Sequence, residues 1–330
     1  GHNTAMELPR VFVSRVVDFD MLKQLDAVAT VVHSEVDGAM PRAALLEAVR
    51  DVDALLCVPT ERVDADLLAA APRLRVAANC AVGYDNIDVA ACTARSVWAT
   101  NTPGVLTETT ADLAFALMLA AARRLGEARD AALAGEWREF YFRKWLGVDV
   151  NGATLCIAGM GRIGAAIARR ARGFGMRILY HNRVIDAAAE AETGARWVSK
   201  DELVRHADFL MLTLPLNTAT RGFIGAGELE RMKPNAVLVN IARGPIVDTE
   251  ALSAALSARR IFAAALDVTD PEPLPPGHPL YGLDNCLIAP HIGSATVRTR
   301  KQMFQTAILN VIAALRGDVP PNCLNPEARA

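Results

Sequence analysis

A repeated alternation of short apolar runs with segments of helical periodicity constrains the fold of this chain more than any other feature. The runs are rich in valine, leucine, isoleucine and alanine, which is typical of strands that are buried on both faces. Helices between such strands return the chain to the same edge of a sheet, so the alternation indicates parallel sheets covered by helices. We therefore predict an α/β fold. The expected strands are residues 11–13, 54–58, 76–78, 97–101, 154–158, 177–180, 209–214, 236–241, 263–268 and 286–289.

The series of strands is interrupted between residues 101 and 154, and this interruption indicates two domains. A chain of 330 residues is long enough to bury two separate cores. Residues 109–125 are predicted to form one helix, because acidic residues lie near its start and arginines near its end. A last amphipathic helix is expected over residues 295–316.

Charge and cysteine content narrow the class of protein. The formal net charge of -2 argues against a general nucleic-acid or anionic-membrane binder, and no apolar run is as long as a membrane span. The six cysteines contain no CxxC pair, so we expect free thiols in a reducing cytoplasm, without disulfides or structural zinc. Residues 1–5 resemble an expression remnant, with Met6 as the expected native start and no secretory signal after it.

A glycine-rich turn, Gly159-Met160-Gly161-Arg162-Ile163-Gly164, follows one expected strand and opens a helix. In such a turn the first glycine permits a tight bend, the second lets a pyrophosphate approach the backbone, and the third lets the helix pack on the strand. The start of the helix offers N–H groups and positive potential to phosphates. A plain structural turn is the alternative, but the order of strand, turn, helix and strand favours a dinucleotide site. The predicted contacts are Gly159, Gly161, Arg162, Ile163 and Gly164.

The end of the next expected strand indicates which dinucleotide binds. NAD sites usually place an aspartate or glutamate there to hold the ribose 2'-hydroxyl. This chain has Asn182 and Arg183 instead, and an arginine can donate charge-assisted hydrogen bonds to a 2'-phosphate that a carboxylate would repel. We therefore predict that NADPH is preferred. A solvated arginine beside a permissive NAD site is the alternative.

Three later strands end in residues that suit the reduction of a carbonyl group. Arg243 follows strand 236–241, and His291 follows the last strand. Asp267 ends the strand between them, and Glu272 lies in its loop. The carboxyl ends of parallel strands meet at one edge, so we expect these side chains to converge. Alone, each has an ordinary alternative as a surface ion pair, a loop residue or a structural histidine.

Together these residue types fit hydride reduction of a keto acid. An arginine can fix the substrate carboxylate and polarise the carbonyl group. A histidine can supply the proton that accompanies the hydride, and a neighbouring carboxylate holds that histidine protonated. No metal site is predicted.

With these residues in place, the chain resembles the D-isomer-specific 2-hydroxyacid dehydrogenase family. The resemblance extends over almost the whole chain and includes residues 81–88 (AVGYDNID), 107–112 (TETTAD) and 322–326 (NCLNP). Within the family it is greatest to the glyoxylate/hydroxypyruvate (2-ketogluconate) reductases. It implies two Rossmann-like or flavodoxin-like domains, with the active site in the cleft between them.

The resemblance also implies roles for particular residues. Arg243 would bind substrate, Glu272 would tune the histidine, and His291 would be the general acid/base. The amides of Val82 and Gly83 would hold the substrate carboxylate. The remaining implied cofactor contacts are Thr110 near the nicotinamide and Asp267 near its carboxamide, together with Leu214, Pro215, Ile241, Ala242, Arg243, His291 and Gly293.

The domain boundaries and the partner follow from the same resemblance. Residues 1–105 and 298–330 would form a discontinuous substrate-binding domain, and residues 106–297 the dinucleotide-binding domain. A homodimer built on the second domain is expected. Trp145 lies in an aromatic stretch and would reach the partner's active site to bind substrate; a buried core or interface tryptophan is the alternative.

The expected reaction is therefore NADPH-dependent reduction of glyoxylate, hydroxypyruvate or 2-ketogluconate to the D-2-hydroxy acid. One alternative is an NAD-dependent D-2-hydroxyacid or phosphoglycerate dehydrogenase. An alternative of another class is a corepressor-like protein that binds the dinucleotide as a sensor. Turnover with keto acids would discriminate between these classes.

Overall fold

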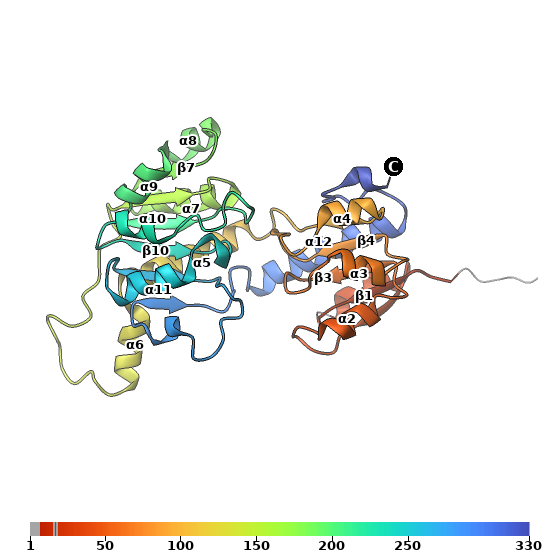
Figure 1. The fold of residues 1–330 in the computed structure, drawn as a ribbon, viewed down its shortest axis with the longest axis horizontal. Coiled ribbons are helices and arrows are strands. Elements are labelled where there is room, and N and C mark those ends of the chain that lie inside the picture. Colours follow the sequence, from red (N-terminus) through yellow and green to blue (C-terminus); the bar gives the residue numbers. More distant parts are fainter. Residues whose placement is uncertain (1–6, 16, 18, 330) are drawn as a thin grey trace, which may run out of the picture. The chain divides into compact units, whose positions relative to one another are not determined.

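The computed structural model describes residues 7–15, 17 and 19–329, so the expected remnant 1–5 and the expected start at Met6 lie outside the described residues. The chain forms two compact units. The first unit spans Gly1–Leu106 and Thr296–Ala330, and the second spans Thr107–Ala295. Each unit contains one sheet in which all paired strands are parallel (Figure 1). The predicted α/β fold is therefore confirmed.

The first unit has a five-stranded sheet with the order β2-β1-β3-β4-β5. Side chains alternate between its faces: Val11 and Val13 contact one core, and Phe12 contacts the other. Helix α12 covers the first of these faces and helices α2 to α4 cover the second. The strands are β1 (Arg10–Val13), β2 (Thr30–His33), β3 (Ala54–Cys57), β4 (Val76–Asn79) and β5 (Trp98–Thr100). The helices are α1 (Phe19–Leu22), α2 (Arg42–Ala48), α3 (Ala65–Ala70), α4 (Val89–Ala94) and α12 (Val297–Leu315), with short 3-10 turns at Lys23–Leu25 and Pro326–Ala328.

The second unit has a seven-stranded sheet with the order β12-β11-β10-β9-β6-β7-β8. Helices α5, α7 and α8 contribute to the core on one face, and helices α9, α10 and α11 to the core on the other. The strands are β6 (Thr154–Ala158), β7 (Arg177–His181), β8 (Arg196–Trp197), β9 (Phe209–Leu212), β10 (Val237–Asn240), β11 (Ala263–Leu266) and β12 (Cys286–Ile288). The helices are α5 (Thr107–Ala122), α6 (Leu125–Leu133), α7 (Arg162–Gly173), α8 (Ala187–Thr193), α9 (Lys200–His206), α10 (Ala226–Arg231) and α11 (Thr249–Ser257), with 3-10 turns at Gly244–Ile246 and Pro279–Gly282.

Two strands were absent from the sequence prediction, and both lie at sheet edges. Among the described residues, strand β2 pairs only with β1. Its side chains alternate between exposed and half-buried, so its sequence lacks a continuous apolar run. Strand β8 has two residues and, in the same described part, pairs only with β7. Edge strands bury less apolar surface than central ones, and this weakens the pattern on which the prediction depends.

The prediction of a single helix over 109–125 was wrong. Helix α5 begins at Thr107 and ends at Ala122, and a second helix, α6, begins at Leu125. Arg124 separates them in a left-handed conformation with a φ of 55°, so the backbone changes direction there. Its guanidinium pairs with Glu127 at 2.7 Å and donates to the carbonyl of Leu146. The predicted last helix, 295–316, is shorter by a few residues as α12.

Candidate active site

The glycine-rich turn joins β6 to α7, and the structure explains two of its glycines. Gly159 has a φ of +99°, and a Cβ there would lie 2.9 Å from the nitrogen of Leu214. A Cβ on Gly164 would lie 2.6 Å from the carbonyl oxygen of Gly159. Both separations are shorter than a carbon contact allows, so a larger residue would push strand, turn and helix apart.

The third glycine leaves room for a ligand. Gly161 precedes the first residue of α7, and a Cβ built on it would meet no atom within 4 Å. The first N–H groups of a helix have no partner within the helix, so those of Arg162 and Ile163 are available to a ligand at this open position. An open approach with several N–H groups and a helix N-terminus fits the pyrophosphate of a dinucleotide. This chain therefore has the cradle that the cofactor needs.

At the end of β7 the structure gives Asn182 and Arg183 different environments. The Asn182 amide makes two hydrogen bonds to the backbone of Met160 in the glycine-rich turn: its Oδ1 accepts from N at 2.6 Å, and its Nδ2 donates to O at 3.0 Å. Arg183 is exposed. The side chain of Asn182 is thus engaged in holding the turn, and Arg183 remains the residue with a cation to offer a 2'-phosphate.

His291 and Glu272 form the centre of the catalytic cluster. His291 Nδ1 lies 2.8 Å from Glu272 Oε2, and the other carboxylate oxygen accepts from the amide of Thr269 at 3.2 Å. Burial by itself raises the pKa of Glu272, but the hydrogen bond and charge of His291, the Thr269 amide and the charge of Arg243 outweigh it, so the pKa is lowered. Glu272 therefore stays ionised beside the imidazole, whose Nε2 is left for a reactant.

Asp267 holds the loop that carries the histidine. Its two oxygens accept from the amides of Ile292 at 2.7 Å and Gly293 at 2.8 Å. The carboxylate is buried, and this burial raises its pKa, although those two amides and the charge of His291 act in the opposite direction. His291 itself has a left-handed backbone, with a φ of 55°. Asp267 thus fixes an unusual backbone conformation directly beside the reactive ring.

Thr110 and Arg243 complete the catalytic cluster of the second unit. A Cβ on Gly293 would lie 3.1 Å from Asp267 Oδ2 and 3.6 Å from Thr110 Oγ1, so these three residues are neighbours. Arg243 follows β10, and the buried Asn240 at the end of that strand holds its loop: Asn240 Nδ2 donates to the carbonyl of Arg243 at 2.9 Å. The second unit therefore brings together Thr110, Arg243, Asp267, Glu272, His291 and Gly293.

The other predicted residues are placed as follows. Leu214 and Pro215 follow β9, beside the glycine-rich turn, and Ile241 and Ala242 lie between β10 and Arg243. Val82 and Gly83 belong to the first unit, in the loop after β4. Trp145 lies in the loop of residues 134–149, where its ring makes an edge-on contact with Tyr141. Among the described residues, no hydrogen bond or ring contact joins Trp145 to the catalytic cluster.

Sequence reasoning missed the residues that hold these loops, Asn240 and Thr269 in the second unit and Asn79 in the first. A polar residue closing an apolar strand, as in VLVN and VAAN, was the available signal. In the part of the chain that the structure describes, no group of three or more His, Cys, Asp or Glu residues is placed to hold a metal. No helix there is both long and apolar enough to cross a membrane.

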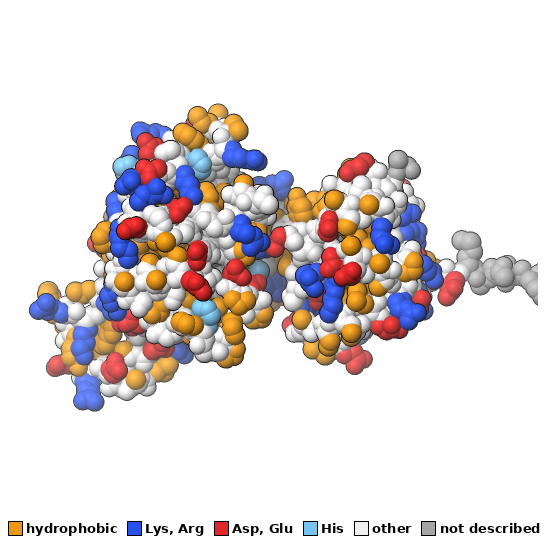
Figure 2. Space-filling view, viewed as in Figure 1, with side chains coloured by type: hydrophobic (Ala, Val, Ile, Leu, Met, Phe, Trp, Pro, Cys, Tyr) orange, Lys and Arg blue, Asp and Glu red, His pale blue; other side chains and the backbone are white. Residues whose placement is uncertain are grey.

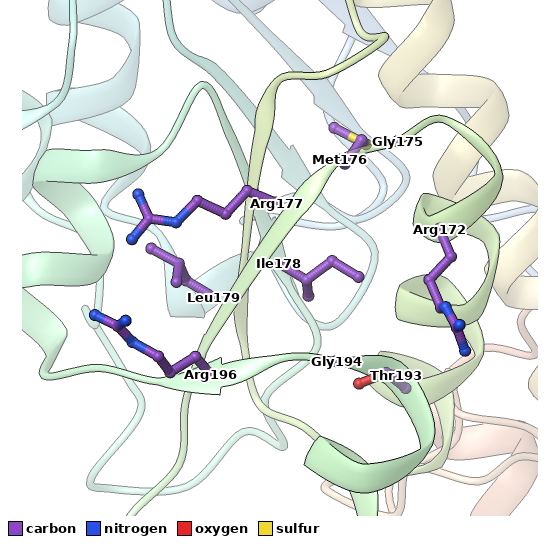
Figure 3. Close-up of a pocket in the computed structure, with 9 residues that line it drawn as sticks. All are labelled: Arg172, Gly175, Met176, Arg177, Ile178, Leu179, Thr193, Gly194 and Arg196. Carbon is purple, nitrogen blue, oxygen red and sulfur yellow. The ribbon is translucent and has the colours of Figure 1, made fainter.

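One hollow in the second unit lies away from this cluster. It is lined by Arg172 near the end of α7, by Arg177 at the start of β7, and by Thr193 and Arg196. Figure 3 shows Arg177 and Leu179 on one side of the strand and Ile178 on the other. Ligands of such sheets bind at the carboxyl ends of the strands, whereas this hollow lies at the amino end of β7. It is therefore separate from the candidate dinucleotide site.

The fold and this cluster define a two-unit α/β protein with a dinucleotide-type turn and a carboxylate–histidine pair. A family model for "D-isomer specific 2-hydroxyacid dehydrogenase, NAD binding domain" matches residues 115–293. The chain belongs to the D-isomer-specific 2-hydroxyacid dehydrogenase family, as the resemblance predicted, and is an oxidoreductase.

Similar proteins and structures cover nearly all of the chain. Glyoxylate reductase of Korarchaeum cryptofilum is 47% identical over 97% of this chain and 96% of its own length. Glyoxylate reductase of Thermococcus kodakarensis is also 47% identical, over 97% of each chain. A crystal structure of a Thermus thermophilus protein has a TM-score of 0.88 and 43% identity, covering 96% of this chain and 99% of that one. NADPH-dependent glyoxylate/hydroxypyruvate reductase of Sinorhizobium meliloti, in complex with NADP and malonate, has a TM-score of 0.84 and 33% identity, covering 96% and 97%.

Proposed function

We propose that this protein reduces glyoxylate and hydroxypyruvate to D-2-hydroxy acids with NADPH, and that 2-ketogluconate is a further candidate substrate. The observation that carries the proposal is the 2.8 Å contact between His291 and Glu272 in the unit that also contains Arg243 and the glycine-rich turn. The relatives named glyoxylate reductase support the substrate class. The similar structure with NADP and malonate supports a phosphorylated dinucleotide and a carboxylate ligand.

Each residue of the cluster then has one task. Bound NADPH supplies the hydride that is added to the keto carbon. Arg243 binds the carboxylate and polarises the carbonyl group through its planar guanidinium. His291 donates the proton from Nε2 to the carbonyl oxygen, while Glu272 holds Nδ1 and stabilises the protonated ring. Asp267 fixes the loop of His291, and Thr110 lines the position next to Gly293.

In the first unit, the amides of Val82 and Gly83 are the proposed donors to the substrate carboxylate. A phosphorylated substrate would carry roughly two additional negative charges, and each of them would need a partner. In this unit, the largely buried Arg15 is already paired with Glu61 at 3.3 Å. We therefore favour hydroxypyruvate over 3-phosphohydroxypyruvate, and a reductase over a phosphoglycerate dehydrogenase.

The proposal includes a homodimer, for which the loop of residues 134–149 is the candidate contact. This loop and the preceding α6 expose large apolar side chains: Phe140 is 86% exposed and Phe142 83%. Exposed aromatic residues grouped on one segment are typical of interfaces. In Figure 1 the loop stands away from the sheet of the second unit. On the face shown in Figure 2, basic and acidic side chains are interspersed, which argues against nucleic acid as a partner.

A panel of keto acids, each assayed with NADPH and NADH, tests the proposal. We expect kcat/KM to be at least about tenfold higher with NADPH, roughly 1.4 kcal/mol. Hydroxypyruvate and glyoxylate should exceed 3-phosphohydroxypyruvate by at least about 10²-fold, because a buried phosphate without partners is costly. Equal use of both cofactors would overturn the NADPH preference. Dinucleotide binding without turnover of any keto acid would favour the sensor class instead.

A further inference from the structure

The loop after β4 has three successive carbonyl groups that are all hydrogen-bonded to the interior of the first unit. The oxygen of Ala81 accepts from the amide of Thr102 at 2.9 Å. The oxygen of Val82 accepts from Asn101 Nδ2 at 3.0 Å, and the oxygen of Gly83 accepts from Asn79 Nδ2 at 3.0 Å. The donors are buried: Thr102 and Asn79 are fully inaccessible and Asn101 is nearly so. The carbonyl groups of three neighbouring peptides are thus all directed toward the interior of the first unit.

The direction of the carbonyl groups determines the direction of the amides. A trans peptide is planar, so the N–H of each residue points opposite to the C=O of the residue before it. Inward carbonyls at Ala81, Val82 and Gly83 therefore turn the N–H groups of Val82, Gly83 and Tyr84 away from the interior. None of these three amides donates to an acceptor among the described residues. Successive outward N–H groups form a concave anion site.

We propose that Asn79 and Asn101 are positioning residues for this anion site, and that Tyr84 supplies its third amide. The anion is the carboxylate of the keto acid, so this inference rests on the proposed function. Neither asparagine touches the substrate. Each acts by holding one carbonyl inward, which keeps the following amide aimed at the carboxylate.

A second shared interaction fixes Asn79 itself. Its amide pairs with that of Asn86, each Nδ2 donating to the other's Oδ1 at 3.1 Å. Asn86 in turn donates to the carbonyl of Glu61 at 2.9 Å, in the loop that follows β3. Asn79 is fully buried and Asn86 half-buried, so the loss of either hydrogen bond would leave a buried polar group of Asn79 without a partner, which is costly. Loop direction is therefore set by β3, β4 and β5 together.

Asn79→Ala and Asn101→Ala test this role, with Asn325→Ala as the matched control. Asn325 is as buried as Asn79 and also holds backbone, since its Nδ2 donates to the carbonyl of Val97 at 2.9 Å, but among the described residues it makes no hydrogen bond to the loop after β4. The measurements are kcat and KM for glyoxylate, KM for NADPH, thermal stability, and the Kd of oxalate as an unreactive carboxylate. Carboxylate binding that is equal in ground and transition states appears in KM and not in kcat.

We expect KM for glyoxylate and the Kd of oxalate to rise about tenfold in the Asn79 and Asn101 variants, with kcat and KM for NADPH within twofold. The Asn325 variant should lose thermal stability while KM and the oxalate Kd stay within twofold. A KM that moves no further in the two test variants than in the control would overturn the inference. If Asn79→Ala does not fold, Asn101→Ala decides, because its side chain lies at the edge of the core. Wild-type protein that binds oxalate but reduces no keto acid would overturn the proposed function alone.

Discussion

The two units hold their functional loops with different chemistry. In the first unit, neutral amides of Asn79 and Asn101 donate to carbonyl oxygens, which leaves backbone N–H groups facing outward. In the second unit, the carboxylate of Asp267 accepts from backbone N–H groups, and Glu272 accepts from another while it contacts His291. A neutral amide cannot titrate, whereas carboxylates and a histidine can. The neutral amides of the first unit suit binding of an anion that does not vary with pH. The carboxylates and histidine of the second unit suit transfer of a proton.

Because of this difference, we expect changes in the first unit to affect substrate binding and changes in the second unit to affect the chemical step. Loss of a neutral contact in the first unit should weaken substrate binding at every pH. Loss of a charged group in the second should slow the chemical step or change its pH dependence.

The largest effect is expected for His291→Ala. Without the imidazole, the proton for the carbonyl oxygen has no positioned donor, and general acid catalysis is typically worth about 10²–10⁴-fold in rate. We expect kcat to fall by that factor while KM for NADPH changes little. His206→Ala, at the exposed end of α9, is the control and should keep full activity. A large rise in KM for the keto acid with normal kcat would contradict the division between the units.

The sequence predicted the central features of both units because they depend on local patterns. Buried parallel strands such as Ala54–Cys57 and Val237–Asn240 are nearly continuous apolar runs, and the glycine-rich turn is contiguous. The pairing of His291 with Glu272 follows once both are placed on neighbouring strand ends. The fold class and the family were thus accessible from the residues alone.

The remaining features depend on contacts that are distant in the chain. The division between α5 and α6 depends on Arg124 meeting Glu127 and the carbonyl of Leu146, which no helical pattern reports. The role of Asn182 depends on Met160, in the turn at the start of the preceding helix. Likewise, the direction of the loop after β4 is set by Asn101, which closes the neighbouring strand. These interactions need the tertiary structure because each joins one segment end to another.

A smaller effect, about tenfold, is expected at the end of β7, where a neutral amide and a cation lie side by side. Asn182 holds Met160 of the glycine-rich turn, and Arg183 is exposed. Arg183→Ala should raise KM for NADPH about tenfold and leave KM for NADH unchanged, because a charge-assisted hydrogen bond to the 2'-phosphate is lost.

Asn182→Ala is the matched variant at this position. It should raise KM for NADPH and KM for NADH by a similar factor, because both cofactors bind at the glycine-rich turn that Asn182 holds. Initial rates at varied cofactor concentration measure the two ratios. Asn182→Ala could instead change the preference for NADPH over NADH more than Arg183→Ala does. In that case it would be wrong to assign Asn182 to holding the turn and Arg183 to binding the 2'-phosphate.

The smallest effect is expected for Glu272→Gln, which replaces a charged holding group with a neutral amide of the kind found in the first unit. Glutamine can still accept a hydrogen bond from the ring but carries no charge beside it, so the pH–rate profile of the reduction should change. The effect of Glu272→Gln on the stability of the folded protein should depend on pH. Although burial raises the pKa of Glu272, the contacts with His291, Thr269 and Arg243 lower it overall. Its carboxylate therefore stabilises the folded state above the ordinary glutamate pKa of about 4.3, and this contribution is lost as pH falls through the lowered value. The difference in Tm between wild type and Glu272→Gln should thus be present at neutral pH and vanish in acid. If this difference stayed constant with pH and the pH–rate profile were unchanged, Glu272 would hold its loop through hydrogen bonds and not through its charge.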